Sequence, residues 1–164
     1  MTDDAAPQPS PPSNRTVSAP VRTRLLVAED EALIRLDLVE MLVEAGYDVV
    51  AQASDGEQAV ALTRELKPDL VMMDIRMPVL DGISAAEQIG KERIAPIVML
   101  TAFSQKELVE RARAAGVMAY ILTPFTASGL APALEIARSR WAQMPRPDSH
   151  VSYLTARPAP RTAP

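Results

Sequence analysis

The chain of 164 residues is long enough for one folded domain with its own core and short for two. It has 48% hydrophobic residues, no cysteine and no apolar run near the roughly 20 residues that span a bilayer, which excludes disulfides and membrane segments and favours a cytoplasmic location. Residues 24–141 hold 12 basic and 18 acidic side chains, a balance of −6 that argues against direct nucleic-acid binding by the folded part.

Prolines gather at both ends of the chain, with five of the 15 before Val21 and five after Gln143. Segments of this composition bury too little apolar surface to offset the entropy lost on ordering. We therefore expect a disordered tail over residues 1–23, one folded domain over 24–141 and a second disordered tail over 142–164.

Strand-like and helix-like runs alternate along this domain as repeated βα units, which predicts a parallel sheet with helices on both faces. Five strands are expected, at residues 25–28, 49–53, 70–74, 97–101 and 117–122. Five helices are expected to follow them in turn, at residues 31–45, 54–66 with Ser54 or Asp55 as the cap, a short one ending near Gly90, 104–115 and 128–141.

Several helix ends are marked by residues with special backbone or capping properties. Gly46 and Gly116 suit the positions after the first and fourth helices, and Ser104 suits the start of the fourth. Pro132 places the start of the last helix near Ala131. Apolar residues at three- and four-residue spacing predict the inner face of the first helix, formed by Leu33, Ile34, Leu38, Met41, Leu42 and Ala45.

Polar side chains follow the apolar strands at the point where each strand ends. Glu29 and Asp30 follow the first strand, Asp74 ends the third, and Thr101 and Thr123 end the fourth and fifth. The carboxyl ends of parallel strands meet at one edge of a sheet, so these five side chains are expected to converge. Three crowded carboxylates repel one another unless a cation lies among them, and oxygen ligands suit Mg²⁺. The sequence therefore predicts a magnesium-binding acidic pocket.

Asp74 is the candidate nucleophile of this pocket, because it directly follows a buried strand and its carboxylate can face both solvent and a metal ion. A carboxylate can accept a phosphoryl group when positive charge and hydrogen-bond donors surround the transferred oxygens. The hydroxyl of Thr101 is a candidate donor to such an oxygen.

Over residues 24–141 the chain resembles the receiver domain of two-component response regulators, in the segments LLVAEDEALIR, PDLVMMDIRMPVLDG, IVMLTAF and AYILTPF. The motifs occur in the family's order and separation, which makes the resemblance specific. It implies a flavodoxin-like (βα)5 fold, a three-layer α/β sandwich whose parallel sheet has the strand order 2-1-3-4-5.

The same resemblance implies a role for each acidic residue of the pocket. Asp74 would be the phosphoacceptor and would receive its phosphoryl group from a histidine kinase or phosphotransfer protein. Asp30 and Asp74 would ligate Mg²⁺ together with the main-chain carbonyl of Arg76. Glu29 would act mostly through water.

Three further positions bear on the expected response to phosphorylation. Thr101 and Tyr120 match the family's switch pair, which reports the modification to the face of the fourth helix, fifth strand and fifth helix. Thr123 stands where the family has a lysine that contacts the phosphoryl group, and losing such a charge-assisted bond costs on the order of 1.5 to 3 kcal/mol. Arg76 is the candidate to supply the missing positive charge in part.

The leading hypothesis is a single-domain response regulator, a signalling module and not a metabolic enzyme, that acts through a downstream protein; a homodimer is left open. More narrowly, the receiver resembles that of antitermination regulators, which carry an RNA-binding ANTAR domain after it; no such domain is expected over residues 143–164, which hold five prolines and no sustained helical periodicity. Two alternatives remain. One is a pseudo-receiver scaffold that works without phosphate because of Thr123, and the other is a shortened RNA antitermination regulator.

Overall fold

The computed structural model describes residues 19–102 and 106–146. Within them a single parallel sheet has the strand order β2-β1-β3-β4-β5, which confirms the expected order. The strands are β1 (Arg24–Ala28), β2 (Asp48–Ala53), β3 (Leu70–Asp74), β4 (Ile97–Ala102) and β5 (Ala119–Thr123). The helices are α1 (Ala32–Glu44), α2 (Gly56–Leu66), α3 (Gly82–Glu92), α4 (Lys106–Ala114) and α5 (Ala127–Gln143).

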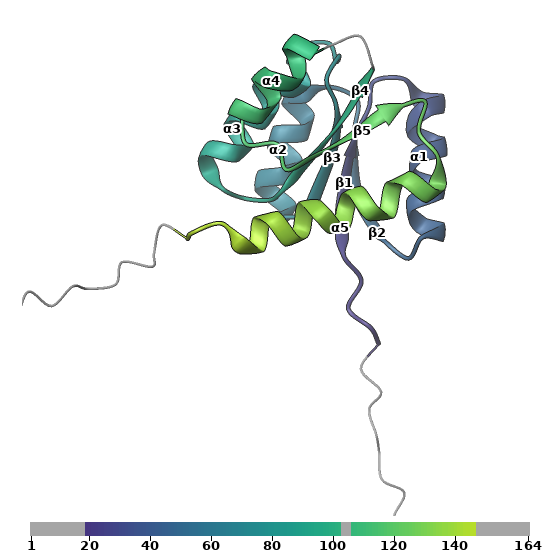
Figure 1. Cartoon of the computed structure of the whole chain (residues 1–164). Helices are drawn as coiled ribbons and strands as arrows, with labels where there is room; N and C mark the ends of the chain where they lie inside the picture. The colour runs from purple at the N-terminus through teal and green to yellow at the C-terminus, as the bar shows by residue number, and fades with distance from the viewer. Residues whose placement is uncertain (1–18, 103–105, 147–164) are drawn as a thin grey trace, which may run out of the picture.

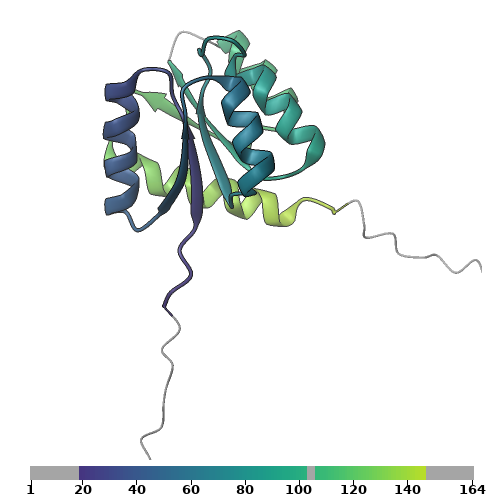
Figure 2. The same ribbon diagram turned by 180° about the vertical axis from the view of Figure 1, so that it is seen from behind.

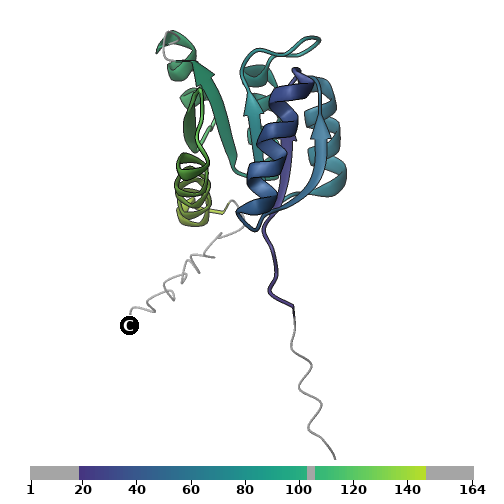
Figure 3. The ribbon, with the colours of Figure 1, turned by 90° about the vertical axis from the view of Figure 1, so that its right-hand side faces the viewer.

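Helices cover both faces of the sheet, so the fold has three layers (Figures 1 and 2). The helices α1 and α5 lie on one face, and α2, α3 and α4 lie on the other. Viewed from the side of α1, this helix lies in front of the strands (Figure 3). The expected flavodoxin-like α/β sandwich is therefore confirmed.

The strands read as continuous apolar runs because successive side chains enter two different cores. In β1, Leu25 and Val27 pack towards α1 and α5, whereas Leu26 and Ala28 pack towards the other three helices. All four side chains are fully buried. The same alternation runs through β3 and β4, so the sheet is fixed from both sides and its carboxyl edge is a rigid base for polar residues.

Most of the helix ends predicted from the sequence occur where expected. Asp55, and not Ser54, caps α2, because its carboxylate accepts a hydrogen bond from the Gln58 main-chain N–H at 2.8 Å. Gly46 and Gly116 follow α1 and α4 with φ values of +94° and +89°, the left-handed region that favours glycine. The predicted Ser104 cap lies outside the described residues.

The predicted inner face of α1 was wrong at Leu33, which is 79% exposed, and at Ala45, which is exposed and lies just beyond the helix as its C-cap. The helix contacts the sheet through Leu38 and Leu42, which are fully buried. Leu33 precedes Leu38 by five residues, about 140° around a helix, and so faces away from the sheet. Leu36 and Val43 are also more than half exposed, which leaves α1 with apolar side chains on its outer side as well.

Two predicted helix limits were also wrong. The helix α3 continues past Gly90 to Glu92 and ends at Arg93, whose φ is +50°. The helix α5 starts at Ala127, one residue from the expected residue 128, and the start near Ala131 that Pro132 indicated was wrong because this proline lies inside the helix. A proline removes the hydrogen bond to the carbonyl four residues earlier, here that of Ser128. Because Ser128 lies in the exposed first turn, solvent can take the place of the missing donor.

In the part of the chain that the structure describes, every helix is too short or too polar to cross a bilayer.

Val79 lies in a strained turn just after β3. Its φ is +68°, and the N–H of Leu80 donates to the carbonyl of Pro78 at 2.7 Å across it. A β-branched side chain in this region costs about 1–2 kcal/mol, and Val79, 75% exposed, gains little from packing. We expect Val79→Asn to raise the free energy of unfolding in urea by about 1 kcal/mol. Val79→Thr keeps the branching and should gain nothing; an equal gain in both variants would contradict strain as the cause.

Candidate functional site

Three carboxylates meet at the carboxyl edge of the sheet. Glu29 and Asp30 directly follow β1, Asp74 ends the neighbouring β3, and one oxygen from each lies within 4.8 Å of the others. Glu29 is buried, Asp74 is half-buried and Asp30 is exposed, so the cluster opens to solvent on one side. An oxygen-only set of this kind fits a hard divalent cation such as Mg²⁺. The structure thus brings together the three carboxylates that the sequence predicted would converge.

Burial and mutual repulsion change the acidity of this cluster. Burial raises the pKa of the Glu29 carboxyl to about 8, with smaller contributions from the negative charges of Asp74 and Asp30. A hydrogen bond from the Glu31 main-chain N–H to Glu29 Oε1, at 3.0 Å, opposes the shift. Burial also raises the pKa of Asp74, against the effect of the main-chain N–H groups of Ile75 and Arg76. A bound cation would stabilise the charged forms of Glu29 and Asp74 and so lower both pKa values.

Main-chain contacts hold the two ends of the cluster in place. The Arg35 guanidinium donates to the Glu29 carbonyl at 2.6 Å, and the Glu29 N–H donates to the carbonyl of Ala53 on β2 at 3.0 Å. On the other strand, the N–H of Gly82 donates to the Ile75 carbonyl at 2.7 Å. Sequence reasoning did not assign a role to Arg35 or Gly82, although the Asp-Gly pair at 81–82 marks a turn.

The two threonines of the predicted site lie on the adjoining strands. Asp74 pairs with Leu100 in the sheet register, so Thr101 comes one residue further along β4 at the same edge. Thr101 is buried, and its hydroxyl donates to the Ala102 carbonyl at 3.3 Å. The hydroxyl of Thr123 donates to the Thr101 carbonyl at 3.4 Å. Position 123 therefore offers this edge a hydroxyl group and no positive charge.

Tyr120 lies apart from the carboxylates, at the second position of β5. It pairs with Met99, and its hydroxyl donates to the carbonyl of Val109 on α4 at 3.1 Å. Burial raises the pKa of this phenol. The side chain thus links β5 to α4, the helix that follows Thr101 in the chain, and its role in switching stays a prediction.

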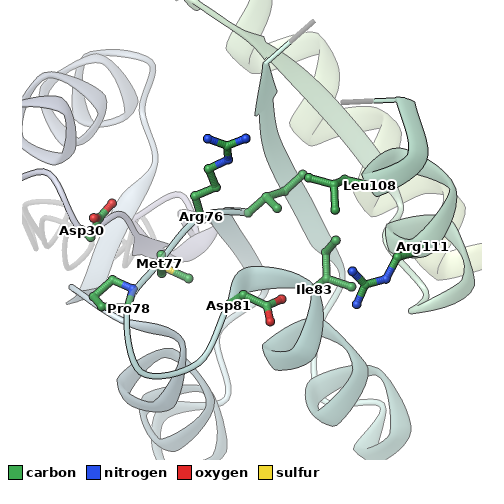
Figure 4. A pocket seen from close by; sticks show the side chains of 9 residues that line it. Asp30, Arg76, Met77, Pro78, Asp81, Ile83, Leu108 and Arg111 are labelled. Carbon is green, nitrogen blue, oxygen red and sulfur yellow. The ribbon is translucent and has the colours of Figure 1, made fainter. Parts of the chain in front are cut away.

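A cavity of about 460 Å³ opens beside Asp30, between the loop after β3 and α4 (Figure 4). The Arg76 side chain lines it and points away from Asp81, whereas Arg111 approaches Asp81 from α4 (Figure 4). Burial would raise the pKa of Asp81, but hydrogen bonds from Ser84 and the positive charge of Arg111 outweigh this, so the pKa lies below its ordinary value. Arg76 and Arg111 are the two cations of this cavity.

We expect the stability of the Mg²⁺-free protein to fall between pH 5 and pH 8. The folded-state pKa of Glu29 is about 8, above its ordinary 4.5, so the folded chain binds this proton more tightly than the unfolded chain does. The resulting stabilisation is complete below pH 4.5 and is lost as the pH rises to 8. The loss should be about 3 kcal/mol, measured by urea unfolding, and Mg²⁺ should reverse it at pH 8. Glu29→Gln should flatten the profile, whereas the exposed Glu31→Gln should not; equal slopes in the two variants would refute the assignment.

The chain resembles known proteins along most of its length. It is 56% identical over 139 residues to the transcriptional regulatory protein PdtaR of Mycobacterium tuberculosis, covering 85% of this chain and 68% of that protein. It is 39% identical over 112 residues to the chemotaxis protein CheY of Thermotoga maritima, covering 68% of this chain and 93% of that one.

Solved structures show the same fold. The receiver domain of the sensor histidine kinase PA1611 from Pseudomonas aeruginosa, with a magnesium ion coordinated in its active-site cleft, matches with a TM-score of 0.65 and 32% identity. That match covers 73% of this chain and 99% of the other. Residues 25–135 match the family model of the response regulator receiver domain. The resemblance expected from the motifs is therefore confirmed, and the chain belongs to the response regulator receiver domain family.

Proposed function

We propose that this chain accepts a phosphoryl group on Asp74 from a histidine kinase or phosphotransfer protein and signals through contact with a downstream protein. The observation that carries this proposal is the meeting of Glu29, Asp30 and Asp74 within 4.8 Å at the strand edge. The cytoplasmic location and the role of signalling module, not metabolic enzyme, belong to the same proposal. The acidic balance of the domain favours a protein and not a nucleic acid as its partner.

The transfer is an in-line displacement at phosphorus. A carboxylate oxygen of Asp74 forms the new bond to phosphorus as the bond to the donor nitrogen breaks, which gives an acyl phosphate. Asp30, Asp74 and the Arg76 carbonyl would hold Mg²⁺, with Glu29 acting through water, and the ion would offset charge on the phosphoryl oxygens. The Thr101 hydroxyl would donate to one of these oxygens. The magnesium ion in the PA1611 receiver supports this set.

The output face in this proposal consists of α4, β5 and α5. Thr101 pairs with Leu122 on β5, so a shift of Thr101 towards a phosphoryl group would act on this strand. Two residues earlier on the same strand, the Tyr120 hydroxyl contacts α4 through the Val109 carbonyl. Leu122 on β5 and Ile136 on α5 are about half exposed, at 47% and 48%, and give this face apolar contact area. A downstream protein, or a second copy of the chain, would bind there.

The proposal is tested by incubating the full chain with Mg²⁺ and acetyl phosphate and measuring its intact mass. We expect the addition of one phosphoryl group, removed by hydroxylamine as an acyl phosphate should be. Chelation of Mg²⁺ before the reaction should prevent the addition. An unmodified mass with both the small-molecule donor and a phosphorylated kinase would refute phosphoryl acceptance.

The second candidate function, a scaffold that works without phosphate, rests on Thr123. This residue places a hydroxyl at 3.4 Å from the Thr101 carbonyl, where a lysine would place a cation. We expect Thr123→Lys to raise the rate of phosphoryl uptake tenfold to a hundredfold, since one charge-assisted bond contributes about 1.5 to 3 kcal/mol. Thr123→Gln adds length without charge and should show little gain. A wild-type chain that takes up no phosphate beside an active Thr123→Lys variant would favour the scaffold.

A further inference from the structure

Three neighbouring hollows surround Trp141 near the end of α5. Their volumes are about 280, 390 and 360 Å³, and the half-buried indole borders each of them. The end of α5 passes below α3 in both views of the ribbon (Figures 1 and 2). Residues that precede β3 and β4 also line the hollows, so they lie at the sheet edge opposite the carboxylate cluster. We call this region, lined also by Lys67, Lys91, Arg93, Ile94, Met118 and Met144, the Trp141 surface.

Positive charge dominates the rim of the Trp141 surface. Lys67, Lys91, Arg93, Arg138 and Arg146 line it, against the carboxylates Asp69, Glu87 and Glu92. Arg138 forms an ion pair with Glu135 at 3.4 Å, and two of the carboxylates also have partners outside the surface. Asp69 accepts the Arg24 main-chain N–H at 2.8 Å, and Glu92 forms an ion pair with Arg64.

The two lysines of the rim are available to a ligand. Among the described residues, neither Lys67 nor Lys91 has an ion-pair partner. Arg93 donates to the Pro145 carbonyl at 2.7 Å and so holds the segment after α5 against α3. The floor between these cations is apolar, formed by Trp141, Met118 and Met144. A cationic rim around an apolar floor stands out on a domain whose charge balance is −6.

We propose that the Trp141 surface docks a short acidic segment of another protein that inserts an apolar side chain beside the indole. The positive charge of the rim favours an acidic partner, and the hollows, of about 280 and 390 Å³, have room for a large apolar side chain. The chain's own residues 147–164 carry Asp148 with Arg157 and Arg161, a charge of the wrong sign. A nucleic-acid backbone would meet the repulsion of the acidic domain as a whole.

The test is a selection of random 12-residue peptides displayed on phage against the full chain, followed by fluorescence anisotropy with the enriched peptides. We expect the enriched peptides to combine Asp or Glu with an aromatic or large aliphatic residue. Lys91→Glu should weaken their binding about tenfold, and so should Lys67→Glu. Arg111→Glu makes the same charge change at the cavity beside Asp30 and should leave binding unchanged. Trp141→Phe, which keeps the helix packed, should weaken binding less than the charge reversals.

Other outcomes would overturn the proposal. Peptides without acidic enrichment, or equal losses in Lys91→Glu and Arg111→Glu, would exclude charge-selected docking. Displacement of the peptides by single-stranded RNA at physiological salt would assign the surface to nucleic acid. A dimer in sedimentation that Lys91→Glu dissociates would assign it to a second copy of the chain. Tighter peptide binding after deletion of residues 147–164 would show that this segment is the occupant.

Discussion

Replacing Asp74 by asparagine is expected to abolish phosphoryl uptake completely while the fold is retained. The amide has the shape of the carboxylate but no nucleophilic oxygen that can form a stable acyl phosphate. Neither neighbouring acid should take over. Glu29 is only 3% exposed, so its carboxylate is poorly accessible to a phosphoryl donor, and Asp30 is needed to hold the cation. The measurement is intact mass after incubation with Mg²⁺ and acetyl phosphate.

The matched control is Asp81→Asn, the same chemical change in the loop that follows β3. Asp81 caps α3 through the Ser84 N–H at 2.9 Å, and asparagine caps helices as well as aspartate does. This variant should therefore take up one phosphoryl group as the wild type does. In the absence of Mg²⁺, Asp74→Asn should also be no less stable than the wild type, because it removes a carboxylate whose charged form is disfavoured by burial and by the nearby charge of Asp30. Phosphate retained by Asp74→Asn would place the acceptor elsewhere.

The carboxylate cluster could be predicted because it depends on strand ends and not on side-chain detail. Each apolar run ends at a polar residue, and parallel strands in a known order bring these polar residues to one edge of the sheet. The strand order itself came from the family resemblance, since hydrophobic periodicity alone does not show which strands are neighbours in the sheet. Given that order, Glu29, Asp30 and Asp74 had to be neighbours, and the distances agree.

Other features depend on contacts that no periodic pattern encodes. Leu33 fits an apolar spacing but faces outward, because the line of contact with the sheet is set by Leu38 and Leu42. Pro132 is tolerated inside α5 because the carbonyl that it leaves without a donor lies in an exposed turn. The positive φ of Val79 follows from the path of the chain between Pro78 and Leu80. It could not be predicted from the residue type, because valine disfavours this conformation. Each case is a tertiary constraint that overrides a local preference.

The loop after β3 meets α3 at Gly82, which packs tightly against the end of the acceptor strand and gives the largest expected effect on stability. A Cβ added there would overlap the main-chain oxygen of Asp74 and lie 3.0 Å from the Ile75 Cα. Backbone atoms cannot rotate aside as a flexible side chain can. The same glycine donates its N–H to the Ile75 carbonyl at 2.7 Å, so the loop cannot retreat without losing that hydrogen bond.

We therefore expect Gly82→Ala to lower the free energy of unfolding in urea by about 3 kcal/mol or more, the range of forced overpacking plus a lost buried hydrogen bond. Gly129→Ala is the matched control, because a Cβ there would meet only the Thr126 hydroxyl oxygen, at an ordinary 3.5 Å. In the first turn of α5 that change should stabilise the chain by about 0.5–1 kcal/mol. Equal free energies of unfolding for the two variants would show that the loop moves aside without a loss of stability.

The position of the overlap also predicts a loss of function beyond the loss of stability. The displaced atoms belong to Asp74 itself, so its carboxylate would move relative to Asp30. The segment after β1 that carries Asp30 is anchored separately, through the Glu29 contacts to Ala53 and Arg35. Phosphoryl uptake by Gly82→Ala should stay low even at a temperature where the variant is fully folded by circular dichroism. A folded Gly82→Ala variant with the wild-type rate would mean that the acceptor tolerates this displacement, and that the tight packing around it serves stability alone.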